Sequence, residues 1–363
     1  MSWSWTLYRY LAYQFLGAVG AIIGGLCLLA FSIDLADAFN RTSQKDMPSE
    51  VVIGMSALKL PHLAGELLPF AVLFGAILAF SRLSRSHELV ATRAAGISAW
   101  EFLAPPLVVA LGLGVFAMAV FNPVSASLLS RYASLEAKYI RGQASQLAVS
   151  RTGLWLRQGG IKEQSVVHAL RVSDQGVHLE DVIIFLYEGR DRFAGRIDAV
   201  KAKLETGKWS LSKAWVSGPD GLPQLHESYD LPTDLTPAQI QESFASPNTI
   251  SFWELPRFIA NAEAAGFSAA RHRLHWYSLV ALPLLFAAMV LMAASFSLRL
   301  SRLGGLPQLV LAAALSGFAV YFFGDVTQAL GISGILPAPL AAAAPAALAI
   351  LVAMTLLFHQ EDG

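Results

Sequence analysis

Six long apolar stretches constrain this chain more than any other feature of its sequence. They lie at Leu11–Phe39, Leu60–Phe80, Leu103–Phe121, Trp276–Phe296, Leu306–Gly324 and Leu336–Phe358. A helix needs about 20 apolar residues to cross the hydrocarbon core of a bilayer, and all six are close to this length or longer. Only 14% of the residues are charged, whereas a water-soluble protein carries about a quarter. The sequence therefore predicts an α-helical membrane protein with six transmembrane helices.

The segment between the third and fourth stretches, Asn122–His275, differs from the rest because it carries most of the charge. It contains short β-rich runs separated by clusters of Gly, Asp and Ser, which predict an antiparallel β-domain. The runs are Gly153–Gln158, Ser165–Val172, His178–Glu188, Arg192–Glu205 and Lys208–Ser217. We therefore expect transmembrane helices in residues 1–121, an inserted β-domain in 122–275 and further transmembrane helices in 276–363.

Two of these runs carry more detailed expectations. In the last run, Trp209, Leu211 and Trp215 share one face of a regular strand. In the run before it, the apolar phase flips between Ile197 and Val200, as it does at a β-bulge. We therefore expect strong curvature or closure of the sheet.

A short helix is predicted near residues 251–265, after the β-rich runs. Ser251 and Glu254 have the spacing of a capping box, and Gly266 is a suitable stop. This helix would lead the chain back to the membrane.

The orientation follows from the basic residues of the short loops, which favour the cytoplasmic side. With six spans, one side carries Arg9, Arg82, Arg85, Arg93, Arg299 and Arg302. The other side carries only Arg41, Lys45 and Lys59 in its short loops. We therefore expect a multi-pass membrane protein with cytoplasmic termini and the β-domain on the outer side of the membrane.

The second loop predicts a short amphipathic helix at about residues 84–96. Ser84 or Ser86 can cap it, and Gly96 can end it. On such a helix Arg85, Glu88, Thr92 and Ala95 fall on one face. Its small residues would let another protein approach closely, and Glu88 would offer that protein a carboxylate. An ordinary interfacial loop helix is the alternative.

Ionisable residues in or near the spans form a second group of candidates. An ionised side chain at mid-bilayer costs about 2.5–3.5 kcal/mol, so such residues tend to be functional. They are Asp34, Asp37, Arg41, Lys59, Glu66 and Asp325. One interpretation is the polar rim of a cavity open to the outer leaflet, which would suit an amphiphilic substrate with a charged head. The other is snorkelling of the side chains to the interface.

The sequence contains no recognisable motif for nucleotide binding, metal binding or nucleophilic catalysis. The nearest approach to a Walker A loop is Gly207–Lys208, which is followed by Trp209 and has Ala202 where the first glycine belongs. The eight histidines are scattered, and the 26 basic residues balance 26 acidic ones. We expect no metal, no cofactor, no nucleic acid and no enzymatic activity.

The order of these elements, together with several short motifs, resembles the LptF/LptG permease family of Gram-negative lipopolysaccharide export. The motif of the second loop is Arg85-Ser86-His87-Glu88-Leu89-Val90-Ala91-Thr92-Arg93-Ala94-Ala95-Gly96. Gly153-Leu154-Trp155-Leu156, Leu235-Thr236-Pro237 and Arg271-His272-Arg273-Leu274-His275-Trp276 add to the likeness. It covers essentially the whole chain, and its details are closer to the LptG branch than to the LptF branch.

The resemblance implies a permease subunit of an ABC transporter that extracts lipopolysaccharide from the inner membrane and passes it to a periplasmic bridge. Its expected partners are an LptB-like ATPase dimer, an LptF-like second permease, and LptC-like and LptA-like bridge proteins. It also implies that the second loop is the coupling helix, with Arg85, Glu88, Thr92 and Arg93 at the ATPase. The β-domain would be jellyroll-like, and the first and fifth helices would gate a cavity.

One position departs from the family pattern. Some members carry several lysines near the outer end of the first helix, whereas this chain has Asp34, Asp37 and Asn40, with only Arg41 basic. A charge contact with lipid phosphates there is therefore in doubt. An alternative function for the whole chain is a membrane-anchored scaffold or assembly factor whose β-domain binds an external protein without transport.

Overall fold

The computed structural model describes most of the chain and divides it into two compact units. The described residues are 5–43, 47–86, 88, 98–136, 139, 146–150, 153–159, 163–173, 177–188, 192–219, 221–233, 246–264, 268–300 and 306–361. The helical unit comprises Met1–Glu136, Asn248–Trp253 and Arg273–Gly363, and the β unit comprises Ala137–Pro247 and Glu254–His272.

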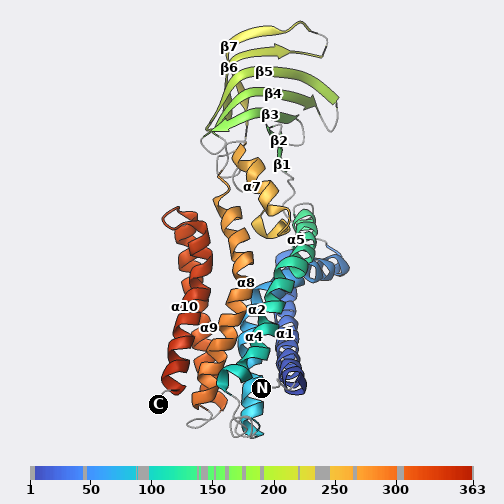
Figure 1. The fold of residues 1–363 in the computed structure, drawn as a ribbon. Helices are drawn as coiled ribbons and strands as arrows, with labels where there is room; N and C mark the ends of the chain where they lie inside the picture. Colours follow the sequence, from blue (N-terminus) through green and yellow to red (C-terminus); the bar gives the residue numbers. More distant parts are fainter. Residues whose placement is uncertain are drawn as a thin grey trace. The chain divides into compact units, whose positions relative to one another are not determined.

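Long helices build the helical unit, and they are drawn in Figure 1. They are α1 (Trp5–Thr42), α2 (Ser49–Arg85), α4 (Ala99–Phe116), the π-helical turn η1 (Ala117–Phe121), α5 (Asn122–Glu136), α8 (Ala270–Leu300), α9 (Leu306–Ile332) and α10 (Ala338–Glu361). Ser98 begins α4 with a capping box, because its Oγ accepts from the Glu101 N–H while Glu101 accepts from the Ser98 N–H.

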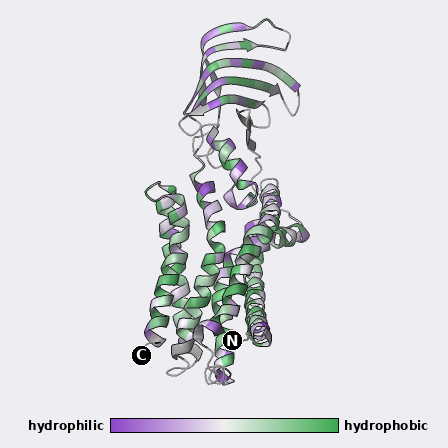
Figure 2. Cartoon of the chain, in the orientation of Figure 1, coloured by the Kyte–Doolittle hydropathy of each residue, from purple (hydrophilic) through white to green (hydrophobic). Residues whose placement is uncertain are grey.

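Five helical stretches of the described chain are long and apolar enough to cross a membrane. They are Trp5–Thr42, Ser49–Arg85, Trp100–Glu136, Ala270–Ser297 and Ala338–His359, and their hydrophobic character is visible in Figure 2. The remaining predicted stretch, Leu306–Gly324, lies in α9, a 27-residue helix that is not among the five. Several side chains in the first turns of α9 lie outside the described residues. The described residues thus provide five such stretches where six were predicted.

The third span extends further than the sequence predicts. It continues through η1 and α5 to Glu136, so the helical unit ends after the boundary expected at Asn122. The segment Asn248–Trp253 also belongs to this unit. The Phe252 N–H donates to Asn122 Oδ1 at 2.8 Å, and Trp253 Nε1 donates to the Ala119 carbonyl at 3.0 Å. A π-turn can leave such a carbonyl available, which is a reason for η1 to lie at this point.

The core of the helical unit combines large buried side chains with close helix contacts at glycines. Large buried side chains such as Phe15, Leu73 and Phe286 fill most of it. In two places a glycine lets helices touch backbone to backbone. A Cβ added at Gly75 of α2 would lie 2.8 Å from Val19 Cα of α1, which is too close for any side chain.

The described residues of the β unit form an antiparallel sheet of seven strands (Figure 1). The strands are β1 (Gln146–Ser150), β2 (Gly153–Gly159), β3 (Glu163–Ser173), β4 (His178–Glu188), β5 (Arg192–Glu205), β6 (Lys208–Ser217) and β7 (Gln224–Pro232). Each strand pairs with its neighbour in the sequence, so the described sheet is a meander. The predicted class, an α-helical membrane protein with an inserted antiparallel β-domain, is confirmed.

One face of the sheet carries the core of the β unit, and the helix α7 (Leu255–Ala264) packs against it. Phe258, Ile259 and Ala262 contribute to this cluster from the helix. The chain turns at residues 252–254 before the helix begins at Leu255. Ser251 is therefore too early to be the predicted cap, and the carbonyl of Glu254 accepts the first helical hydrogen bond, from Phe258.

A crease crosses five strands of the sheet. In each of these strands one residue is not paired with the residue opposite it on the neighbouring strand, although the register is the same on both sides of that position. These residues are Leu170, Asp181, Val200, Lys213 and Glu227. Asp181 and Lys213 have positive φ angles of 54° and 50°. Such a conformation is costly for residues with a Cβ. It here reverses the alternation of side chains that a regular strand imposes.

The crease accounts for the outcome of two predictions made from the sequence, one for β5 and one for β6. In β5 the buried positions shift phase between Ala199 and Ala202, slightly after the predicted flip. In β6 Trp209 and Leu211 are buried, whereas Trp215 is 48% exposed. The prediction that all three share one face is wrong, because the crease at Lys213 lies between them.

Candidate functional site

The first candidate lies where α2 ends. The helix continues through Arg85, and Ser86 Oγ donates to the Arg82 carbonyl at 3.1 Å. Ser84 and Arg85 thus belong to α2, and the helix predicted at 84–96 does not begin with them. Thr92 and Arg93 lie outside the described residues.

Glu88 is described, and it contacts the first helix. The Tyr10 hydroxyl donates to Glu88 Oε1 at 3.3 Å, and Gln14 Nε2 donates to the same hydroxyl at 3.3 Å. A tyrosine hydroxyl has a single proton, so the amide of Gln14 leaves that proton for the carboxylate. The structure therefore connects Glu88 to α1, which nothing in the sequence pattern predicted across 78 positions.

The second candidate is the group of ionisable residues proposed as a rim. Lys59 Nζ of α2 lies 2.6 Å from Asp34 Oδ1 of α1, and the two side chains are only 25% and 12% exposed. The Lys59 ammonium also lies 5.8 Å from the ring centroid of Tyr132 in α5. A cation at that distance from an aromatic face is attracted to it. These three side chains join three helices.

A second ion pair occupies the neighbouring turn of α1. Arg41 Nη2 lies 2.5 Å from Asp37 Oδ2, one helical turn away, with both side chains about half exposed or more. Exposed pairs of this kind contribute little to stability. Both predicted basic residues, Lys59 and Arg41, are thus already paired with carboxylates.

The remaining rim candidates have different surroundings. Glu66 Oε1 lies 3.4 Å from His62 Nε2 within α2, and His62 was not predicted as a site residue. Asp325 lies on an exposed position of α9, one turn after Tyr321. The ring of Tyr321 packs against Phe70 of α2 with centroids 5.8 Å apart, so it connects α9 to the helix that carries Glu66.

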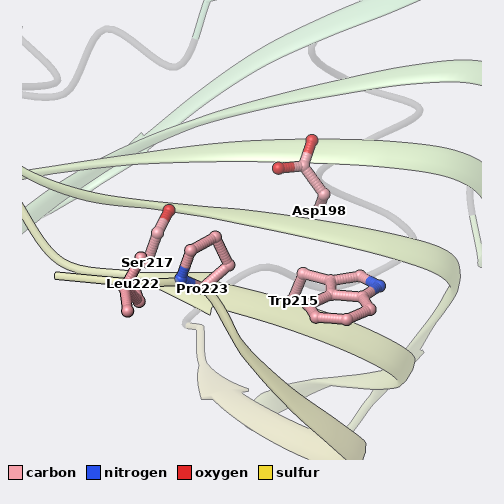
Figure 3. A pocket seen from close by; sticks show the side chains of 5 residues that line it. All are labelled: Asp198, Trp215, Ser217, Leu222 and Pro223. Carbon is pink, nitrogen blue, oxygen red and sulfur yellow. The ribbon is translucent and has the colours of Figure 1, made fainter.

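A shallow pocket of about 610 Å³ lies on the β unit. Figure 3 shows its lining, formed by Asp198, Trp215, Ser217, Leu222 and Pro223. Asp198 already accepts from Arg196 Nη2 at 2.6 Å, and this bond raises the pKa of the Arg196 guanidinium. The pocket is therefore an apolar hollow beside a neutralised ion pair.

The described residues include no group of three or more potential metal ligands. Together the apolar helices, the β unit inserted into their sequence and the paired charges of the spans define a multi-pass membrane protein with an inserted β-domain.

Comparison with known proteins identifies the family. Residues 9–359 match the model of the lipopolysaccharide export system permease LptF/LptG family. The chain is 26% identical over 316 residues to the lipopolysaccharide export system permease protein LptG of Escherichia coli strain K12, covering 84% of each chain. The LptG protein of Escherichia coli O6:H1 matches to the same extent. The chain belongs to the LptF/LptG family.

Proposed function

We propose that this chain is the permease subunit of an ABC transporter that extracts lipopolysaccharide from the inner membrane and passes it to a periplasmic bridge. The observation that carries the proposal is the family match, which spans both the helices and the β unit. The sequence has no Walker A loop, so ATP is hydrolysed in a separate, LptB-like ATPase dimer. An LptF-like permease completes the membrane part, and LptC-like and LptA-like proteins receive the lipid.

The segment after α2 is the ATPase contact in this proposal, with Arg85, Glu88, Thr92 and Arg93 as its polar residues. Its position is supported by the basic residues that cluster on the same side, because such loops stay in the cytoplasm. The termini are then cytoplasmic and the β unit is periplasmic. Glu88 supplies the carboxylate that docks on the ATPase.

The ionisable residues of α1, α2 and α9 form the polar rim of the lipid cavity in this proposal; they are Asp34, Asp37, Arg41, Lys59, Glu66 and Asp325. Their support is the pairing of Asp34 with Lys59 at 2.6 Å and of Asp37 with Arg41 at 2.5 Å. The Asp34–Lys59 pair is largely buried, and buried charges need such partners in a region of low dielectric constant. The two pairs cancel in charge, and Glu66 and Asp325 keep the rim polar and acidic.

The test uses the complete complex in proteoliposomes that contain lipopolysaccharide. Glu88→Ala is expected to lower either the ATPase recovered with the chain or the lipid released per ATP hydrolysed. Glu50→Ala is the matched control, because Glu50 is an exposed carboxylate in the first turn of α2, the helix that Glu88 follows in the chain.

Two results would contradict the proposal. If the chain purified from native membranes brings neither a second permease nor an ATPase, it is no transporter subunit, and a scaffold role takes its place. If Glu88→Ala matches Glu50→Ala in every readout, the coupling role of Glu88 fails while the family assignment stands.

A further inference from the structure

We propose that Tyr10 is the positioning residue for Glu88 and that it transmits movement of the ATPase contact to α1. This inference rests on the proposed function, because it takes Glu88 as the docking carboxylate. The hydrogen bond gives Glu88 a second connection to the helices, besides the peptide chain that joins it to α2. Glu88 follows α2 in the chain, but the hydrogen bond of 3.3 Å from Tyr10 also attaches it to α1.

The hydrogen-bond chain fixes where the Tyr10 proton points. Gln14 lies one turn after Tyr10 and donates its amide to the Tyr10 oxygen at 3.3 Å. The hydroxyl therefore donates to the Glu88 carboxylate, and a bond to an ionised acceptor is stronger than a bond between neutral groups. Arg9 is directed elsewhere, since its guanidinium lies 5.9 Å from the ring centroid of Tyr13.

α1 is a long, uninterrupted helix that can transmit movement from one end to the other, as a lever does. It is a single helix of 38 residues without an internal proline, whereas α2 contains Pro61 and Pro69, each of which removes a helical hydrogen bond. Tyr10 lies near one end of α1 and Asp34 near the other, about 36 Å apart at 1.5 Å per residue. Asp34 is held to Lys59 at 2.6 Å. An unbroken helix therefore connects the Glu88 contact to the proposed rim.

The packing of α1 provides a point about which the helix can tilt. Its described buried residues lie close together at Leu11, Phe15, Ala18 and Val19, apart from Thr42 at the end. Val19 is where the backbone of α1 meets Gly75 of α2. Beyond this contact, a Cβ added at Gly20, Gly24 or Gly25 would meet no atom within 4 Å. The segment between Val19 and Asp34 contains no buried residue among those described, so it packs less tightly than the turns from Leu11 to Val19.

The two arms of the lever have different lengths. From Val19, Tyr10 is about 14 Å away and Asp34 about 22 Å away at the rise of an α-helix. A tilt driven at Tyr10 would be enlarged at Asp34, where it would strain the ion pair with Lys59. In this way a displacement of Glu88 by the ATPase would reach the proposed rim.

Tyr10→Phe tests this inference because it removes only the hydroxyl. Tyr13→Phe is the matched control: Tyr13 lies one turn further along α1, is 66% exposed and has its ring beside Arg9. In the complete complex with lipopolysaccharide in proteoliposomes, Tyr10→Phe is expected to lower the lipid released per ATP by about three- to tenfold, the loss typical of one intramolecular hydrogen bond. Tyr13→Phe is expected to leave this ratio unchanged.

A double mutant separates positioning from a general structural effect. If Tyr10 acts through Glu88, then Tyr10→Phe added to Glu88→Gln should lower the ratio little further, because coupled residues are not additive. A coupling ratio for Tyr10→Phe equal to that of Tyr13→Phe would overturn the inference. So would a loss of bound ATPase with an unchanged ratio in the complexes that remain.

The two proposals fail separately. If Glu88→Ala has an effect and Tyr10→Phe has none, the proposed role of Tyr10 and α1 is wrong, whereas the docking role of Glu88 stands. No effect of either variant removes the docking role itself.

Discussion

Lys59 and Asp34, 25 positions apart in the sequence, form a largely buried ion pair with 2.6 Å between Nζ and Oδ1. The pair joins α1 to α2, and the Tyr132 ring of α5 lies 5.8 Å from the ammonium. A pair in such a place is costly to break, since removing one partner leaves the other charge buried alone. The sequence placed both residues near the same interface but could not show that they meet.

Lys59→Met is therefore expected to destabilise the helical unit by about 1–3 kcal/mol, because Asp34 keeps a buried carboxylate without a cation. Combining it with Asp34→Asn should recover part of this loss. Thermal unfolding of the detergent-solubilised protein measures both changes. Arg41→Met is the control, because its pair with Asp37 is exposed and should contribute less than about 1 kcal/mol. Equal effects of Lys59→Met and Arg41→Met would show that burial of the first pair is unimportant.

Trp209 and Trp215 offer a matched comparison within β6. Trp209 is 1% exposed and Trp215 48% exposed, on opposite sides of the crease. Trp209→Ala is expected to destabilise the β unit by about 3–5 kcal/mol, the usual loss for a buried aromatic side chain. Trp215→Ala should cost far less. The urea dependence of proteolysis within residues 137–247 of the full chain measures this difference. Similar midpoints for both variants would contradict the crease.

The crease also marks the limit of what sequence could predict for the β unit. The five β-rich runs were recognised because they are rich in β-forming residues and separated by clusters of Gly, Asp and Ser, and all five lie in strands of the structure. The phase flip in β5 was visible because both halves of that strand are apolar enough to show it. In β6 the alternation alone gave the wrong face for Trp215. A positive φ at Lys213 leaves no signature when the residue is not glycine or asparagine.

The helical unit shows a similar limit. Apolar length located its spans because hydrocarbon imposes that requirement directly, but it did not locate their ends. The third span continues to Glu136 because α5 stays helical after its apolar residues end. Of the candidate site, sequence supplied the residue types, such as Glu88, Lys59 and Asp34. Their partners depend on tertiary contacts, as the bond from Tyr10 to Glu88 shows.

Lys213→Gly is expected to stabilise the β unit by up to about 1 kcal/mol, because glycine adopts a positive φ without the cost that a Cβ incurs. The φ of Lys213 is 50°, so the native residue bears this cost. Lys203→Gly in β5 is the control, since a glycine at a regular strand position should destabilise by about 0.5–1 kcal/mol. The same proteolysis measurement gives both signs. A loss of stability in Lys213→Gly would mean that the lysine side chain contributes more than its backbone costs.

Gly114 and Gly112 of α4 test how closely two membrane helices approach. A Cβ added at Gly114 would overlap Cα of Pro283 in α8, whereas one added at Gly112 meets nothing within 4 Å. Backbone atoms cannot move aside as the end of a long side chain can, so Gly114→Ala must push α8 away and open the core around Phe286. We expect a clear drop in the thermal midpoint and in the yield of folded protein for Gly114→Ala. Gly112→Ala should be neutral or slightly stabilising, because alanine is the better helix former. Both variants change one methyl group on the same helix, and a difference between them reports on the contact with Pro283 alone. Equal midpoints would show that α4 and α8 are further apart than the structure places them.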